Sequence, residues 1–178
     1  MTDTQIETAA TLSPGWRDGR GPLAVLPRLL FRDVRPWLAI LVGWLLTIGG
    51  STLIGWGIAH IAPDNSGPDF GDVSAATKLF LIALFSPVVE TAIMAGVLSI
   101  LLRFLAPWQA VIASALLWGV AHSLSSPWWG VVIWWPFLIF STLYVTWRPH
   151  GFWRAAGLVA VVHILQNLFP ALLIVIGR

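Results

Sequence analysis

Residues 78–105 read KLFLIALFSPVVETAIMAGVLSILLRFL, and this stretch decides the fold. Between Lys78 and Arg103 the single charged side chain is Glu90, twelve residues from the first and thirteen from the second. An α-helix needs about 20 mostly apolar residues to cross the hydrocarbon core of a bilayer. Because lipid offers the backbone no hydrogen-bond partners, such a segment must be helical. The stretch therefore predicts a membrane-spanning helix with a carboxyl group near its middle.

Four further stretches are long and apolar enough for the same interpretation: residues 37–61, 108–124, 128–147 and 152–176. The stretch at 108–124 is the shortest of them. In the whole chain 57% of residues are hydrophobic and 10% are charged, and the mean hydropathy is +0.82. Soluble domains carry about 25% charged residues, so lipid must cover most of this surface. We expect an all-α, polytopic transmembrane helix bundle of about five spans.

Three segments divide the chain. Residues 1–21 are polar and lack the apolar core of a signal peptide, so we expect a disordered tail there. Residues 22–36 mix leucines with arginines, which is typical of an amphipathic segment lying at the membrane interface. Residues 37–178 then form the transmembrane domain. The chain has no cysteine, which excludes disulfides and thiolate metal sites.

The basic residues follow membrane topology. Their net excess is small, at +2, and they are too sparse to indicate nucleic-acid binding. Eight of the ten fall on one side of the predicted spans: Arg17, Arg20, Arg28, Arg32, Arg35, Arg103, Arg148 and Arg154. Because basic residues concentrate in cytoplasmic segments, this asymmetry predicts a multi-pass protein, of a bacterial inner membrane, with its N-terminus in the cytoplasm.

Polar side chains inside predicted spans are the candidates for function. Glu90 is the last acidic residue of the chain, and intramembrane carboxylates usually face the bundle interior and serve a function. His122 lies near the end of one span and His163 in the middle of another. Asn167 follows His163 by four residues, which places both on one helical face. Gln166 lies about a hundred degrees around the same helix and is expected to point elsewhere.

These residue types suit more than one chemistry. A glutamate can activate water as a general base, while histidine and asparagine can stabilise an oxyanion, which together would hydrolyse an amide. Glu90, His122 and His163 could instead hold zinc with an open position for water. A third possibility is a haem carrier with His122 and His163 as axial ligands. That possibility leaves Glu90 without a role.

The same residues resemble a known family. Intramembrane proteases of the CAAX protease and bacteriocin-processing family, also called CPBP or Abi, carry three motifs on separate helices: EExxxR, FxxxH and HxxxN. The type II CAAX prenyl endopeptidases belong to that family. Here the three motifs, over roughly residues 79–170, correspond to the segments starting at Glu90 (ETAIMA), at Trp118 (WGVAH) and at His163 (HILQN).

The resemblance implies an endopeptidase acting on a membrane-associated peptide or protein. It assigns water activation to Glu90, assistance to His122, and oxyanion stabilisation to His163 and Asn167. We expect a metal-free reaction, since the chain lacks the second carboxylate that would support a metal; zinc remains possible. With the N-terminus inside, the site would open nearer the outer face.

Two departures keep an alternative open. Thr91 stands where the family has its second glutamate, and Ala95 stands where it has arginine. Losing both members of a buried ion pair leaves no orphan charge, so the change is compatible with activity. It is equally compatible with an inactive family member that serves as a membrane adaptor or binding protein.

Overall fold

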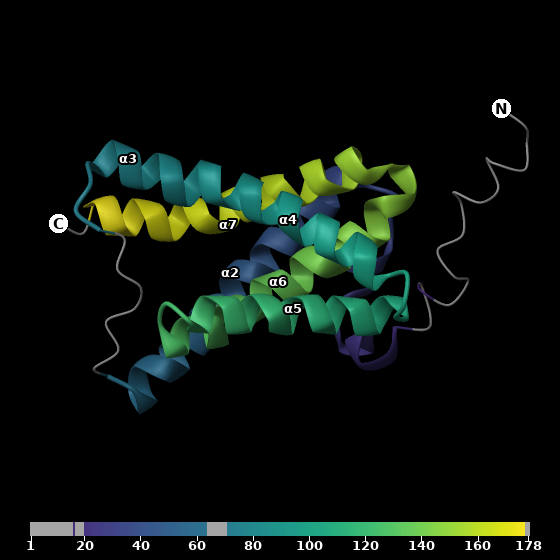
Figure 1. Ribbon diagram of the computed structural model, residues 1–178, viewed down its shortest axis with the longest axis horizontal. Coiled ribbons are helices and arrows are strands. Elements are labelled where there is room, and N and C mark those ends of the chain that lie inside the picture. Colours follow the sequence, from purple (N-terminus) through teal and green to yellow (C-terminus); the bar gives the residue numbers. More distant parts are fainter. Residues whose placement is uncertain (1–15, 17–19, 64–70, 177–178) are drawn as a thin grey trace, which may run out of the picture.

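The computed structural model describes Trp16 and residues 20–63 and 71–176, and this part of the chain is a bundle of helices without strands (Figure 1). The elements in chain order are η1 (Gly21–Val25), η2 (Arg28–Phe31), α2 (Pro36–Ile61), α3 (Ala75–Phe80), η3 (Leu81–Phe85), α4 (Ser86–Leu101), α5 (Pro107–Ser123), α6 (Pro127–Trp147), η4 (Arg148–His150) and α7 (Phe152–Ile176). The all-α prediction is confirmed.

Four helices are long and apolar enough to cross a membrane: Pro36–Ile61, Ala75–Leu101, Pro127–His150 and Phe152–Ile176. These confirm a multi-pass membrane protein. The fifth expected span, α5, has 17 residues, which is short of the about 20 that a full crossing needs. The helix expected to continue to residue 105 ends at Leu101, because residues 102–106 reverse the chain before Pro107 opens α5.

Helix α6 forms the centre of the bundle. Of its apolar window 67% is buried inside the protein, against 17–33% for the other three spanning helices. Helix α5 packs closely along it, because Gly119 and Gly130 leave no side chain between the two backbones. A Cβ on Gly130 would collide with the carbonyl oxygen of Gly119. Small residues at helix interfaces allow this approach in membranes.

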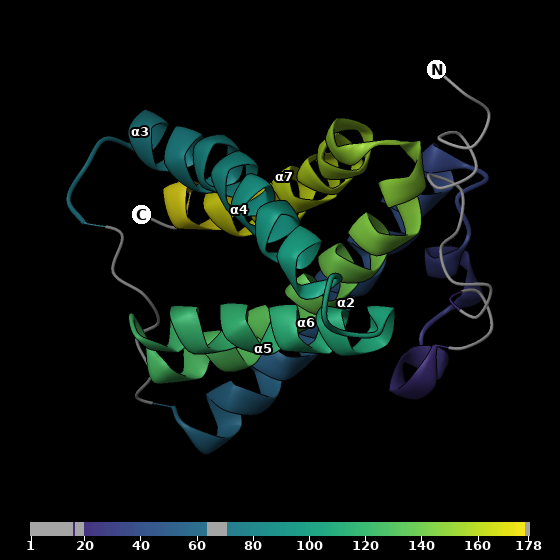
Figure 2. The same ribbon diagram turned by 45° about the vertical axis from the view of Figure 1, so that its right-hand side comes forward.

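Helix α7 joins the two halves of the bundle. In both views α3, η3 and α4 form one continuous rod that lies beside α7, while α5 and α6 lie on the other side of the molecule (Figures 1 and 2). Helix α2 contacts both α6 and α7. At the contact with α7, Trp44 Nε1 donates to the Leu165 carbonyl at 3.2 Å. The space between α4, α5, α6, α7 and α2 is where the candidate site forms.

The segment at residues 22–36, expected to lie at the membrane interface, contains 3-10 turns that pack against the bundle. The second turn, η2, buries Leu30 and Phe31, and the Thr146 hydroxyl donates to the Leu30 carbonyl oxygen at 2.8 Å. Trp16, within the stretch expected to be a disordered tail, is also buried, and its Nε1 donates to Thr146 Oγ1 at 3.1 Å. The rest of that prediction falls largely outside the described residues.

Candidate active site

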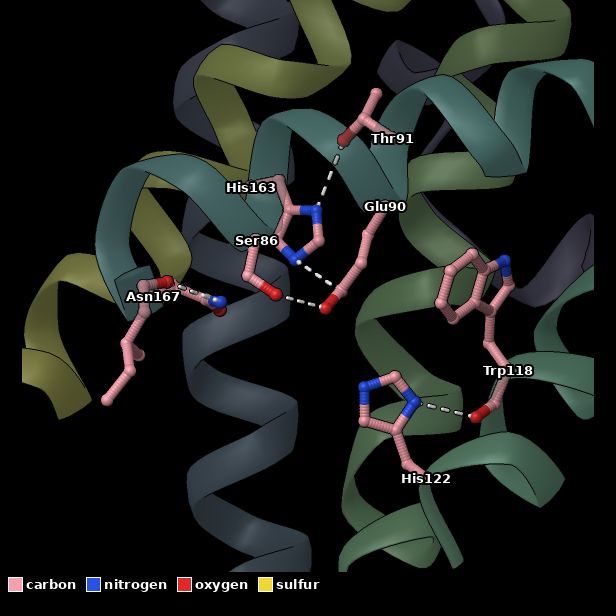
Figure 3. Close-up of polar contacts among 8 residues, drawn as sticks. Ser86, Glu90, Thr91, Trp118, His122, His163 and Asn167 are labelled. Atoms are coloured by element: carbon pink, nitrogen blue, oxygen red, sulfur yellow. Dashed lines mark hydrogen bonds and ion pairs between the residues drawn. The ribbon is translucent and has the colours of Figure 1, made fainter. Parts of the chain in front are cut away.

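Glu90 faces the interior from α4. Its Oε1 accepts a hydrogen bond from Ser86 Oγ at 2.5 Å, one helical turn earlier on the same helix (Figure 3). Helical serines in membranes usually bond back to their own backbone. Here the hydroxyl is directed at the carboxyl group instead. This contact holds Glu90 in one orientation and leaves its other oxygen, Oε2, facing the neighbouring helix α7.

His163 lies between two residues of α4. Its Nε2 is 3.7 Å from Glu90 Oε2, and its Nδ1 is 3.1 Å from the hydroxyl oxygen of Thr91. The carboxyl group is an acceptor beside Nε2, so the Nε2–H tautomer fits this site, with Thr91 donating to Nδ1. The ring is 3% exposed and packs on Phe140, with centroids 4.5 Å apart. His163 is thus fixed on all sides.

His122 approaches from the opposite side, near the end of α5. Its Nδ1 lies 2.9 Å from the Trp118 carbonyl oxygen, and since a carbonyl only accepts, Nδ1 must carry the proton. In the neutral ring this leaves Nε2 as an acceptor. The ring meets Trp129 edge-on at 4.8 Å between centroids. Figure 3 shows the ring across from Glu90, with no hydrogen bond drawn between the two side chains.

Asn167 of α7 contacts the turn η3. Its Nδ2 donates to the carbonyl oxygen of Ile82, in the π-helical turn η3, at 3.2 Å. In that turn the N–H of Ser86 bonds to the carbonyl of Leu81, five residues back. The next such bond would join Pro87 to Ile82, but proline has no N–H. Asn167 therefore satisfies a carbonyl that the helix itself cannot.

All four predicted residues line one cavity of about 420 Å³. Glu90, His122, His163 and Asn167 come from three helices and converge there, although they span 77 positions of the sequence. Most of the remaining wall is apolar and comes from α2, α6 and the second half of α7. A carboxyl group and an imidazole acceptor on opposite sides of such a cavity can hold a water molecule between them.

Three polar residues of the cavity region were not predicted as part of the site. Ser86 and Thr91 contact Glu90 and His163 directly. The (i, i+4) spacing of Ser86 and Glu90 was a readable signal, whereas the Thr91 contact joins residues 72 positions apart. Gln166 was not expected to join His163 and Asn167, yet it is buried and lines the same cavity.

The sequence leaves zinc open, with Glu90, His122 and His163 as its possible ligands. Within residues 20–63 and 71–176 no group of three His, Cys, Asp or Glu side chains is placed to hold a metal ion. A haem iron would have to bind His163 through Nε2, which lies beside Glu90, because Nδ1 is hydrogen-bonded to Thr91.

Comparisons with protein-family models, curated proteins and solved structures found no match for this chain. The motifs and the geometry of the cavity are therefore the features that indicate a function.

Proposed function

We propose that the protein is an intramembrane endopeptidase of the CPBP type, in which Glu90 activates the water that attacks a peptide bond. The observation that supports this most is the convergence of Glu90, His122, His163 and Asn167 on one largely apolar cavity. Burying one carboxyl group and two imidazoles inside a membrane protein is costly, and such clusters usually serve a function.

The proposed reaction uses these contacts. Glu90 removes a proton from water while the water oxygen bonds to the peptide carbonyl carbon, and His122 Nε2 orients that water as an acceptor. The carbonyl oxygen becomes an oxyanion, which accepts from His163 Nε2–H and from the second hydrogen of the Asn167 amide. The carbon–nitrogen bond then breaks, and Glu90 returns the proton to the leaving amine. Glu90 ends the cycle as it began.

The wall of the cavity indicates the substrate class. From the polar centre it continues along apolar residues of two helices, among them Ile48 of α2 and Leu173 of α7. An apolar segment of a membrane-associated peptide or protein fits this wall, whereas a charged peptide would lose its hydration there. The substrate class we propose is therefore an apolar, membrane-embedded segment.

The topology that we propose places the N-terminus in the cytoplasm of a bacterial cell. The segments rich in arginine gather at one end of the bundle: η1 packs near Trp108 at the start of α5, and η2 packs against Thr146 near the end of α6. His122 lies at the far end of α5, close to the turn at residues 124–126. The site is thus nearer the face opposite the arginines, which under the positive-inside rule is the outer face.

The test uses purified protein reconstituted in liposomes with membrane proteins of its native cell. New N-termini would be identified by mass spectrometry for the wild type, Glu90→Gln and Asp72→Asn. Asp72 is an exposed carboxylate outside the cavity, which makes it the matched control. We expect cleavage by the wild type and by Asp72→Asn, with a loss of at least about 10²-fold in Glu90→Gln.

Equal cleavage by Glu90→Gln would refute the proposal. A parallel reaction with a chelator addresses the metal: inhibition would contradict the metal-free mechanism without removing the protease. The sequences around the new N-termini would name the substrate.

One observation favours the alternative of an inactive adaptor. Ala95 of α4 is fully buried. It stands where the resembled family has arginine, so the positive charge of that motif is absent from this chain. An adaptor would bind its partner equally well with Glu90→Gln. A cellular phenotype that survives Glu90→Gln, with no cleavage by the wild type, would support the adaptor over the protease.

A further inference from the structure

Gln166 has an unused acceptor beside the cavity. The residue is 9% exposed, lies on α7 and contributes to the cavity wall. Its Oε1 is buried and has no hydrogen-bond partner among the described residues. Buried polar atoms are nearly always paired, so an unpaired acceptor on a residue of the cavity wall is available to a ligand or to water. None of the catalytic roles assigned above uses this atom.

A second unpaired atom lines the same cavity from α2. Ser51 Oγ is buried and has no partner in the described part of the chain. The contrast with Thr47, one turn earlier, is informative: the Thr47 hydroxyl donates to the carbonyl of Trp44 at 2.9 Å, as helical hydroxyls in membranes usually do. Ser51 does not. An acceptor on α7 and a hydroxyl on α2 therefore both remain free where the cavity is otherwise mostly apolar.

We propose that Gln166 and Ser51 form a subsite for the backbone of the substrate, in which Gln166 Oε1 accepts a hydrogen bond from a peptide N–H. This proposal rests on the proposed function and names what the cavity recognises next to the scissile bond. A peptide must leave its helical conformation to be cleaved, and inside a membrane each freed N–H and C=O then needs a new partner. Gln166 Oε1 accepts a hydrogen bond from the freed N–H, and the Ser51 hydroxyl donates one to the freed C=O.

The neutral character of the subsite favours an amide over other ligands. A cationic ligand would need a carboxylate beside Gln166 and Ser51. Glu90 is the one carboxylate among the residues that line the cavity, and it is already assigned to the activation of water. An anionic group would lack a cationic partner, since no Lys or Arg lines it. A peptide group carries one donor and one acceptor without charge, which matches the two unpaired atoms.

The experiment measures binding, so it does not depend on cleavage. The probes are N-octylhexanamide, a secondary amide with one N–H, and N-methyl-N-octylhexanamide, the tertiary amide that lacks it. Their Kd values for the purified protein in detergent would be compared between wild type, Gln166→Met and Glu90→Gln. Methionine keeps the length and shape of the side chain while removing the acceptor.

We expect the wild type and Glu90→Gln to bind the secondary amide about tenfold more tightly than the tertiary one, the effect of one hydrogen bond. Gln166→Met should bind both with similar Kd. Replacing Ile133, which lines the cavity, with Trp should weaken both amides and so locate the binding. Equal binding of the two amides by the wild type, or an undiminished preference in Gln166→Met, would overturn the subsite. Glu90-dependent cleavage could still hold in that case.

Discussion

Replacing Thr91 with Val tests the hydrogen bond between Thr91 of α4 and His163 of α7. Thr91 is 1% exposed, and its hydroxyl is 3.1 Å from His163 Nδ1. Valine has nearly the same shape, so the change removes the hydrogen bond and leaves a buried imidazole nitrogen without a partner. Such a loss costs about 1–3 kcal/mol. We expect the free energy of unfolding in mixed micelles to fall by that amount.

Two further measurements separate positioning from stability alone. The ¹⁵N NMR signal of His163 Nδ1 should shift in Thr91→Val and stay in place in Thr91→Ser, which keeps the hydroxyl. Cleavage should fall about tenfold in Thr91→Val, because the ring beside Glu90 is no longer held in one orientation. The reasoning is refuted if Thr91→Val unfolds within about 0.5 kcal/mol of the wild type and leaves the Nδ1 signal unchanged.

Two other changes probe the packing around the site. A Cβ at Gly50 would collide with the indole of Trp135, so Gly50→Ala should lower the free energy of unfolding in detergent by about 1–3 kcal/mol. A Cβ at Gly49 would meet no atom, so Gly49→Ala should leave that free energy unchanged. A drop of equal size in both would contradict the close contact of α2 and α6. Asn167→Leu should lower stability by about 1–3 kcal/mol in addition to activity, because it strands the Ile82 carbonyl; unchanged stability would leave Asn167 with a purely catalytic role.

The fold was predictable because hydropathy alone determines it. A helix that must cross lipid needs a long apolar run, and the runs around residues 37–61, 128–147 and 152–176 agree closely with the observed helices. The N-terminal segment was harder. Its leucines and arginines suit an interfacial helix equally well, and only the contacts of Leu30 and Trp16 with Thr146 show that it folds back onto the bundle.

The candidate site was predictable to the extent that its members are unusual in a membrane. Glu90, His122 and His163 stand out because charge and imidazole are rare inside spans, and the structure brings them to one cavity. Gln166 and Thr91 do not stand out, since neutral polar residues are common on helices. Their importance depends on what α2 and α7 place opposite them, and the sequence does not carry that information.

Thr91 and Asn167 together explain how the site can differ from the resembled family and still hold its shape. In the resembled motif the position of Thr91 carries a charge; here a neutral hydroxyl meets the same helix, α7, and holds His163 by one hydrogen bond. One turn further along α7, Asn167 bonds to the carbonyl that Pro87 leaves unpaired in η3. These two bonds tie α7 to the rod of η3 and α4 on either side of Glu90. Both bonds are made by neutral side chains, so the packing of α7 against this rod at these two points requires no buried ion pair.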